Sequence, residues 1–228
     1  MAARTLSGLE KQIVACRKCD RLVAHREEIA RKKRRAYLAD TYWGRGVPGF
    51  GDPRAWLVLV GLAPGAHGAN RTGRVFTGDR SGDFLYAALH RKGFASQPTS
   101  NSRDDGLKLT DAYITSSCRC VPPDNHPSPD ELAACAPFLA NELKLLKPRV
   151  LLALGGIAFE AVLDFWAGQG ASLPQPRPKF GHGAEVAIPG QPHLLASYHV
   201  SQQNTQTGRL TQAMFDAVLE RATVLGGR

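Results

Sequence analysis

The stretch WLVLVG at residues 56–61 decides the fold, because apolar or small residues follow one another there without a polar break. A strand with one wet face alternates polar and apolar residues, so an unbroken run predicts a strand that is buried on both faces. Three further stretches are strand candidates: 111–117 (DAYITSS), 150–154 (VLLAL) and 194–197 (LLAS). Buried strands of this kind are typical of a parallel sheet covered by helices.

Helical patterns separate these strands along the chain. They are expected at 5–40, around 81–92, at 129–146, from the Gly155-Gly156 pair to 166, and at 206–224. At the third of these, Ser128 and Glu131 have the spacing of a capping box. The Gly- and Pro-rich stretches 44–54 and 167–192 are expected to be loops, the second with a short strand-like excursion at 186–188. Strands alternating with helices predict a single α/β domain over residues 1–228 with helices on both faces of its sheet.

In open parallel sheets, ligands bind beyond the carboxyl ends of the strands. The two most unusual loops of this chain follow Val60 and Tyr198, directly after two of the predicted strands. We therefore expect a functional site between these two loops.

The composition favours a cytoplasmic protein that acts as a monomer. No apolar run approaches the roughly 20 residues that span a bilayer, and the N-terminal sequence MAARTLSGLEKQ lacks the apolar stretch of a signal peptide. The formal net charge is +9, and residues 1–54 hold 13 Lys/Arg against 6 Asp/Glu.

Five consecutive cations, RKKRR, occupy residues 31–35. One interpretation is a solvated helix face. The other is a surface that contacts phosphates, because clustered Lys and Arg displace counterions from nucleic acid. Charge alone does not choose DNA over RNA or over an acidic protein.

The cysteines indicate a metal site of unspecified kind. Cys16 and Cys19 form a C-x2-C pair, and Cys120 and Cys135 can supply two more thiolates, while Cys118 is equally well explained as a small core residue. Disulfides are disfavoured inside cells, so ligation has to be weighed. Four thiolates suit structural zinc or an iron–sulfur cluster, and the spacing does not decide between them.

The loop after the first strand reads GLAPGAHGANRTGRVFTGD over residues 61–79. It contains neither the dinucleotide fingerprint nor a Walker motif. One interpretation is a tight turn from strand to helix. The other is a base pocket beside a phosphate backbone, because the loop carries an aromatic, two cations and a carboxylate: Phe76, Arg71, Arg74 and Asp79.

Two more segments carry candidate site residues. HVSQQNTQTGR at 199–209 places His199 before an unusually polar loop at the expected ligand edge, although a lone histidine there is often structural. CVPPDNHP at 120–127 joins a candidate metal ligand to Asn125, which either reads the edge of a base or caps a turn.

Taken together, these three loops resemble those of family-5 (type-b) uracil-DNA glycosylases, from about residue 16 to the final helix. GLAPGAHGANRTGRVFTGDRSG and HVSQQNTQTGRLT look like that family's two signature motifs, and CVPPDNHPSPDELAAC resembles a cluster-binding segment. The resemblance implies a three-layer α/β/α sandwich with a central four-stranded parallel sheet. It also implies a [4Fe–4S] cluster on Cys16, Cys19, Cys120 and Cys135, with Cys118 outside it.

The resemblance further implies an enzyme that flips a uracil nucleotide out of DNA and hydrolyses its N-glycosidic bond. Phe76 would stack on the base, Asp79 would orient water or offset positive charge on the sugar, His199 would stabilise the departing base, and Asn125 would fix base or water. The other residues expected at the base are Gly61, Ala63 and Gly65. Those expected at the DNA are Arg34, Arg35, Arg71, Arg74, Gln202, Asn204 and Arg209.

One departure from the family-1 enzymes bears on substrate range. Their first motif has a carboxylate before the proline and a tyrosine after it, whereas this chain has Ala63 and Gly65 around Pro64. The carboxylate would therefore come from Asp79, and the pocket should be roomier and accept hypoxanthine or other modified bases. Two alternatives remain open, a metal-stabilised nucleic-acid-binding module without catalysis and a zinc-dependent hydrolase.

Overall fold

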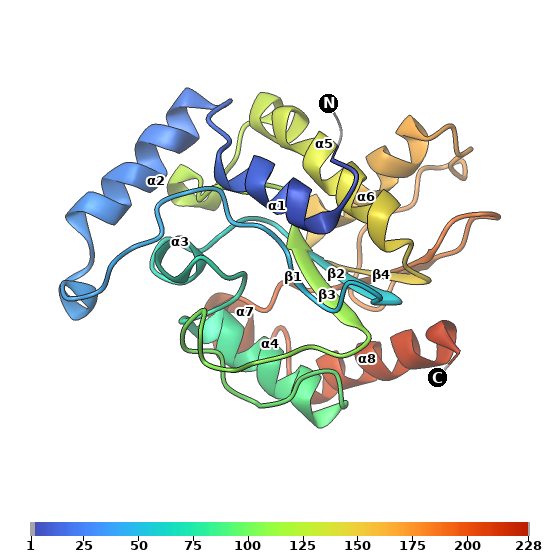
Figure 1. Ribbon diagram of the computed structural model, residues 1–228. Helices are drawn as coiled ribbons and strands as arrows, with labels where there is room; N and C mark the ends of the chain where they lie inside the picture. The colour runs from blue at the N-terminus through green and yellow to red at the C-terminus, as the bar shows by residue number, and fades with distance from the viewer. Residues whose placement is uncertain (1–2, 228) are drawn as a thin grey trace.

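The computed structural model describes residues 3–227, which are built around one six-stranded sheet (Figure 1). The spatial order is β1-β3-β2-β4-β6-β5. The four central strands are parallel, and the two outer strands run antiparallel to their neighbours. The strands are β1 (Phe50–Gly51), β2 (Leu57–Gly61), β3 (Ala112–Ser116), β4 (Val150–Leu154), β5 (Glu185–Val186) and β6 (His193–Ser197).

Helices cover both faces of the sheet, which confirms the predicted sandwich. In Figure 1, α4 and α8 lie on one side of the sheet and α1, α5 and α6 on the other. The helices are α1 (Leu6–Val14), α2 (Asp20–Lys32), α3 (Ala69–Thr72), α4 (Arg80–Arg91), α5 (Pro129–Leu146), α6 (Gly156–Gly168), α7 (Gln202–Gln206) and α8 (Gln212–Gly226), with short 3-10 turns η1 (Arg35–Tyr37) and η2 (Pro123–Asn125).

The unbroken apolar run of β2 is explained by these two layers. Leu57 and Leu59 pack with α4 and α8 in one core, whereas Val58 and Val60 pack with α5 and α6 in the other. Successive side chains of a strand point to opposite faces, so both alternating sets must be apolar when both faces are buried. The predicted four-stranded parallel core is confirmed.

The sequence did not predict β1 and predicted only part of β5. Each of these edge strands has only two residues and makes its contacts with another segment of the chain. β1 pairs with β3, and β5, which overlaps the predicted excursion at 186–188, pairs with β6. Both edges are short and antiparallel, a common way of ending a parallel sheet.

Two predicted helices differ in their bounds from those in the structure. The segment 5–40 is divided into α1 and α2 where the C-x2-C pair lies, and α2 ends at Lys32, followed by Lys33, whose φ of 53° is left-handed. The helix expected at 206–224 begins later, as α8, where Thr211 caps it by accepting a hydrogen bond from the Met214 N–H. The capping box of Ser128 and Glu131 at the start of α5 is confirmed.

None of the helices in the described part of the chain is long and apolar enough to cross a membrane.

Candidate active site

A cavity of about 300 Å³ opens at the carboxyl ends of the central strands. Its walls come from the loop after β2, the end of β3, the η2 turn and the loop after β6. This is the edge at which the sequence placed the site. The cavity brings together six of the predicted base-site residues: Ala63, Gly65, Phe76, Asp79, Asn125 and His199.

Phe76 forms one wall of the cavity in an unusual backbone conformation. Its φ of 49° is left-handed, which is uncommon for a bulky residue. The ring lies over Gly61, where an added Cβ would come within 2.9 Å of the ring, and its centroid is 6.1 Å from that of His199. Gly61 is buried and does not line the cavity, so its contribution is to leave room for Phe76.

Asp79 is the N-cap of α4 and is half-buried at the base of the same cavity. Its Oδ1 accepts the Gly82 N–H at 3.0 Å. Burial raises the pKa of this carboxyl, while hydrogen bonds from the Gly82 and Ser81 backbone N–H groups oppose the rise. The other oxygen, Oδ2, lies against two glycines, since an added Cβ would stand 2.9 Å from it at Gly65 and 1.8 Å from it at Gly68.

His199, in the loop after β6, lies beside Phe76 and lines the same cavity as Asp79. Burial lowers the pKa of its imidazole, so the ring is neutral at physiological pH and retains one N–H donor. The loop is held by Asn204, whose side-chain Nδ2 donates to the His199 carbonyl at 2.8 Å. Asn125 reaches the cavity from η2 with a φ of 59°, a conformation that asparagine tolerates better than most residues.

Sequence reasoning missed four polar residues of the cavity: Ser81, Ser116, Ser201 and Gln203. Ser116 ends β3, and the strand pattern gave no reason to separate it from its buried neighbours. Gln203 lies beside the predicted Gln202 in a helix of five residues, and the direction of each side chain depends on that helix, which the sequence did not reveal.

The sequence model of the uracil DNA glycosylase superfamily matches residues 48–223, a span that contains the whole cavity. The chain belongs to this superfamily, among the type-5 uracil-DNA glycosylases. It is 55% identical over 216 residues to the type-5 uracil-DNA glycosylase of Thermus thermophilus, which covers 94% of this chain and 95% of the relative. It is 48% identical to the type-5 enzyme of Mycobacterium bovis, in an alignment that covers 99% of this chain and 83% of the relative. It is 43% identical to that of Pyrobaculum aerophilum, where the alignment covers 95% of this chain and 91% of the relative.

Two arginines that the sequence places at the DNA are engaged inside the protein in this structure. Arg74 is 3% exposed and forms an ion pair with Asp105 at 2.7 Å, with further bonds to Ser100 and Thr77. Arg71 has a side chain only 12% exposed and pairs with Asp40 at 2.6 Å. Their guanidinium groups are held by carboxylates inside the protein, so neither is free to pair with a phosphate in this structure, and their contact with DNA stays a prediction.

The remaining residues expected at the DNA differ in their surroundings. Arg34, Arg35, Gln202 and Arg209 are exposed, and Arg209 lies over the Tyr198 ring at 4.7 Å. Asn204 is half-buried and is engaged with the His199 carbonyl, so its visible role is to shape the loop.

The five cysteines lie in one cluster, packed with apolar side chains of α1, α2 and α5. Burial raises the pKa of the Cys19 thiol, and the nearby Cys135 and Cys16 thiols raise it further. A hydrogen bond from the Cys118 thiol lowers the pKa of Cys135. Across residues 3–227, no group of three or more His, Cys, Asp or Glu side chains is arranged to hold a single metal ion, which does not bear on a multi-iron cluster, whose ligands stand further apart.

Arg26 is buried at 1% exposure beside this cluster. Its Nη1 donates to Cys120 Sγ at 2.9 Å and its Nη2 to the Cys16 carbonyl at 3.0 Å. Its Nε is buried and has no hydrogen-bond partner among the described residues. The Arg119 backbone N–H also donates to sulfur, to Cys135 Sγ at 3.2 Å.

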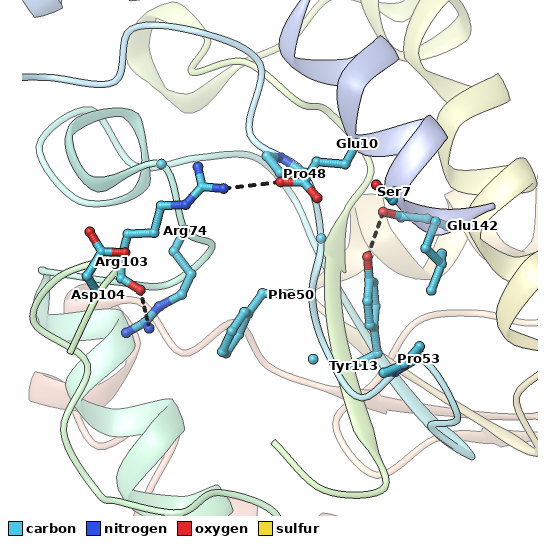
Figure 2. Close-up of a pocket in the computed structure, with 14 residues that line it drawn as sticks. Ser7, Glu10, Pro48, Phe50, Pro53, Arg74, Arg103, Asp104, Tyr113 and Glu142 are labelled. Atoms are coloured by element: carbon cyan, nitrogen blue, oxygen red, sulfur yellow. Dashed lines mark hydrogen bonds and ion pairs between the residues drawn. The ribbon is translucent and has the colours of Figure 1, made fainter. Parts of the chain in front are cut away.

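A second cavity, of about 420 Å³, lies between α1, the segment around β1 and α5 (Figure 2). Figure 2 shows Arg103 reaching Glu10, and Tyr113 donating to Glu142. Glu142 is also paired with the buried Arg119 at 2.5 Å. Because Glu10 and Glu142 are engaged by arginines and no lining residue is shared with the Phe76 cavity, we assign no catalytic role to this cavity.

Proposed function

We propose that this protein removes uracil from DNA by hydrolysing the N-glycosidic bond, leaving an abasic site. The observation that carries the proposal is the cavity that joins Phe76, Asp79 and His199 at the carboxyl ends of the sheet. Enzymes that act on a base in a duplex flip it into such a pocket and stack it on an aromatic side chain.

Each residue has a chemical task in this reaction. Phe76 stacks on the flipped base, and Asn125 supplies an amide that fixes the base or the attacking water. The bond electrons leave with the base, and the neutral His199 donates a hydrogen bond to the oxygen where negative charge develops. Asp79 orients the water and accepts its proton as the C1′–O bond forms, and its charge offsets the positive character of the sugar.

We further propose that the pocket accepts hypoxanthine and other deaminated bases as well as uracil. Ala63 and Gly65 leave the wall beside Asp79 free of large side chains, and Phe76 stacks on any base, because stacking depends little on base identity. The reaction class is the same for each base, so one set of residues serves all of them.

A strand-cleavage assay tests both statements. Duplexes containing uracil, hypoxanthine or an undamaged base are incubated with the protein and then treated with alkali, which cuts at abasic sites. We expect cleavage of the first two and none of the third. No abasic sites in any duplex would favour the alternative of a nucleic-acid-binding module without catalysis, and cleavage at uracil alone would contradict the broad pocket.

We also propose that Cys16, Cys19, Cys120 and Cys135 hold a [4Fe–4S] cluster. The four thiols lie in one cluster of side chains, and the guanidinium of Arg26 beside them suits the negative charge of a thiolate-ligated cluster. The unpartnered Arg26 Nε and the Arg119 N–H at Cys135 are donors of the kind that tune such sulfurs. The cluster would tie the junction of α1 and α2 to α5 and the loop after β3.

The cluster proposal predicts a difference between the cysteines. Protein purified without oxygen should be brown, absorb in the visible range and contain about four irons, the number in the proposed [4Fe–4S] cluster. Cys120→Ser should lose iron and visible absorbance, because it removes a ligand. Cys118→Ser, the matched control, should retain both, since Cys118 is outside the proposed set. One bound zinc per chain with no visible absorbance would contradict the proposal and favour a zinc protein.

The DNA surface is proposed to comprise the exposed Arg34 and Arg35 with Gln202 and Arg209 near the cavity mouth. Exposed arginines are free to pair with phosphates. The consecutive cationic residues at 31–35 suit the DNA backbone, which carries regularly spaced negative charges. We propose that the protein acts on DNA as a monomer in the cytoplasm, at the nucleoid.

A further inference from the structure

Arg71 lies in the glycosylase motif, yet its guanidinium faces the protein rather than the surface. It donates in three directions, from Nε to the His67 carbonyl at 2.7 Å, from Nη1 to Asp40 at 2.6 Å and from Nη2 to the Gly78 carbonyl at 3.0 Å. The planar guanidinium of arginine carries its donors on three nitrogens in a fixed fork, so it can reach three acceptors that lie in different directions. Gly78 immediately precedes Asp79.

The same guanidinium is joined to the segment that follows the basic run. Its carbon atom lies 4.0 Å from the centre of the Tyr37 ring, a cation–π contact. Tyr37 and Asp40 therefore hold Arg71 from the side of the basic run, and Gly78 holds it from the side of Asp79. Figure 1 shows the chain after α2 turning back to run beside α3, the short helix that carries Arg71.

Other hydrogen bonds also connect these two segments, and they do not involve the Arg71 side chain. The Trp43 N–H donates to the Arg71 carbonyl at 2.9 Å, and the Gly44 N–H to the Asn70 carbonyl at 3.1 Å. The Tyr42 hydroxyl and His67 Nδ1 are 2.9 Å apart. The segment 37–44 is thus bound at several points to the loop between β2 and α4, and the Arg71 side chain adds a hydrogen bond to Gly78, the residue before Asp79.

We propose that Arg71 is a positioning residue, which couples the DNA-contacting basic segment at 31–40 to the catalytic loop and so fixes the backbone that carries Asp79. Phosphates drawn to Arg34 and Arg35 then act on a segment that is tied to residue 78. This inference rests on the proposed catalytic role of Asp79. Arg71 itself does not contact substrate.

The test separates the rate of base release from DNA affinity. Single-turnover excision of uracil is measured with enzyme in saturating excess, and the dissociation constant is measured by fluorescence anisotropy at several salt concentrations. Arg71→Met should lower the saturated rate by roughly 10- to 100-fold, because small misplacement of a catalytic group has effects of that size. Affinity and its salt slope should stay close to those of the native protein.

Asp40→Asn provides a milder variant, because Asp40 is partly exposed at 38% and its loss should not prevent folding. It should lower the saturated rate in the same direction, and the double variant should be no slower than Arg71→Met alone. Arg91→Met, which breaks a peripheral ion pair with Asp216 on α8, is the matched control and should keep the native rate.

Two results would overturn the coupling. If Arg71→Met keeps the native saturated rate but weakens binding and reduces the salt slope by about one, Arg71 contacts phosphate. If Asp40→Asn has the native rate, the basic segment is not joined to catalysis. An active Asp79→Asn variant would instead sink the proposed role of Asp79, so the two failures are distinguishable.

Discussion

Replacing Asp79 by Asn is expected to slow base release by about 10²- to 10⁴-fold while leaving DNA affinity within about twofold of the native value. Asn retains the shape of the side chain and can still cap α4 through its oxygen. It loses the negative charge that orients water and offsets charge on the sugar. The measurement is single-turnover excision of uracil alongside anisotropy binding to the same duplex.

Asp83→Asn is the matched control, because Asp83 is an exposed carboxylate in the first turn of the same helix. It should keep a near-native rate. If both variants lose activity equally, or if Asp79→Asn loses rate and affinity in parallel, then Asp79 has a structural or binding role.

The pH dependence follows from the direction in which the pKa of Asp79 is shifted. Burial raises it above the ordinary aspartate value, which is about 3.9. The ionised form is the active one, so the rate should fall as pH is lowered through this raised pKa, at a higher pH than an ordinary aspartate would give. A rate that stays constant down to about pH 4 would contradict this expectation.

A rise in pH has the opposite effect on stability to the one it has on the rate. A carboxyl whose pKa is raised on folding favours the protonated form in the native state, so its contribution to stability is present at low pH and is lost as pH rises through the folded pKa. At neutral pH the buried charge therefore costs stability. Asp79→Asn should have a melting temperature at least as high as that of the native protein.

Replacing Gly68 by Ala is expected to lower the rate of base release by roughly 10²-fold or more, because it displaces a catalytic group. Gly68 makes no chemical contribution itself. A Cβ at this position would lie 1.8 Å from Asp79 Oδ2 and 2.6 Å from its Cγ. Both distances are far shorter than van der Waals contact, so the Asp79 carboxylate has to move away from its position against Gly65 and Gly68.

Gly168→Ala is the control, because no atom lies within 4 Å of the added Cβ. The double variant Gly68→Ala/Asp79→Asn should be no slower than Asp79→Asn alone if Gly68 acts only through Asp79. Additive losses would show that residue 68 matters for another reason. A native rate in Gly68→Ala would mean that the Asp79 side chain has a second productive position.

The position of the Asp79 carboxylate against these glycines also changes the interpretation of Gly65. The sequence suggested that a small residue there enlarges the base pocket. In the structure Gly65 lines the cavity, and an added Cβ would approach Asp79 Oδ2 to 2.9 Å. The glycine therefore makes room for the carboxylate that comes from Asp79, as well as for the base.

The central sheet, the main helices and the edge at which the cavity opens were predictable from the order of residues along the chain. Burial on both faces leaves a continuous apolar run in each strand, and the Ser128 capping box is satisfied by residues three apart, so both are visible locally. The motif loops also indicated Phe76, Asp79, Asn125 and His199 as neighbours, because the carboxyl ends of parallel strands meet at one edge.

The partners of the charged residues in those loops could not be predicted in this way and are known from the folded structure. Arg71 and Arg74 look alike in sequence, as cations in a loop at the ligand edge. Each is held by a carboxylate 31 residues away, Asp40 for the first and Asp105 for the second. The partner of a charge is set by which distant segments the fold brings into contact, and no local pattern records it. For the same reason, the packing of Asp79 against Gly65 and Gly68 and the pairing of the short edge strands could be seen only in the three-dimensional structure.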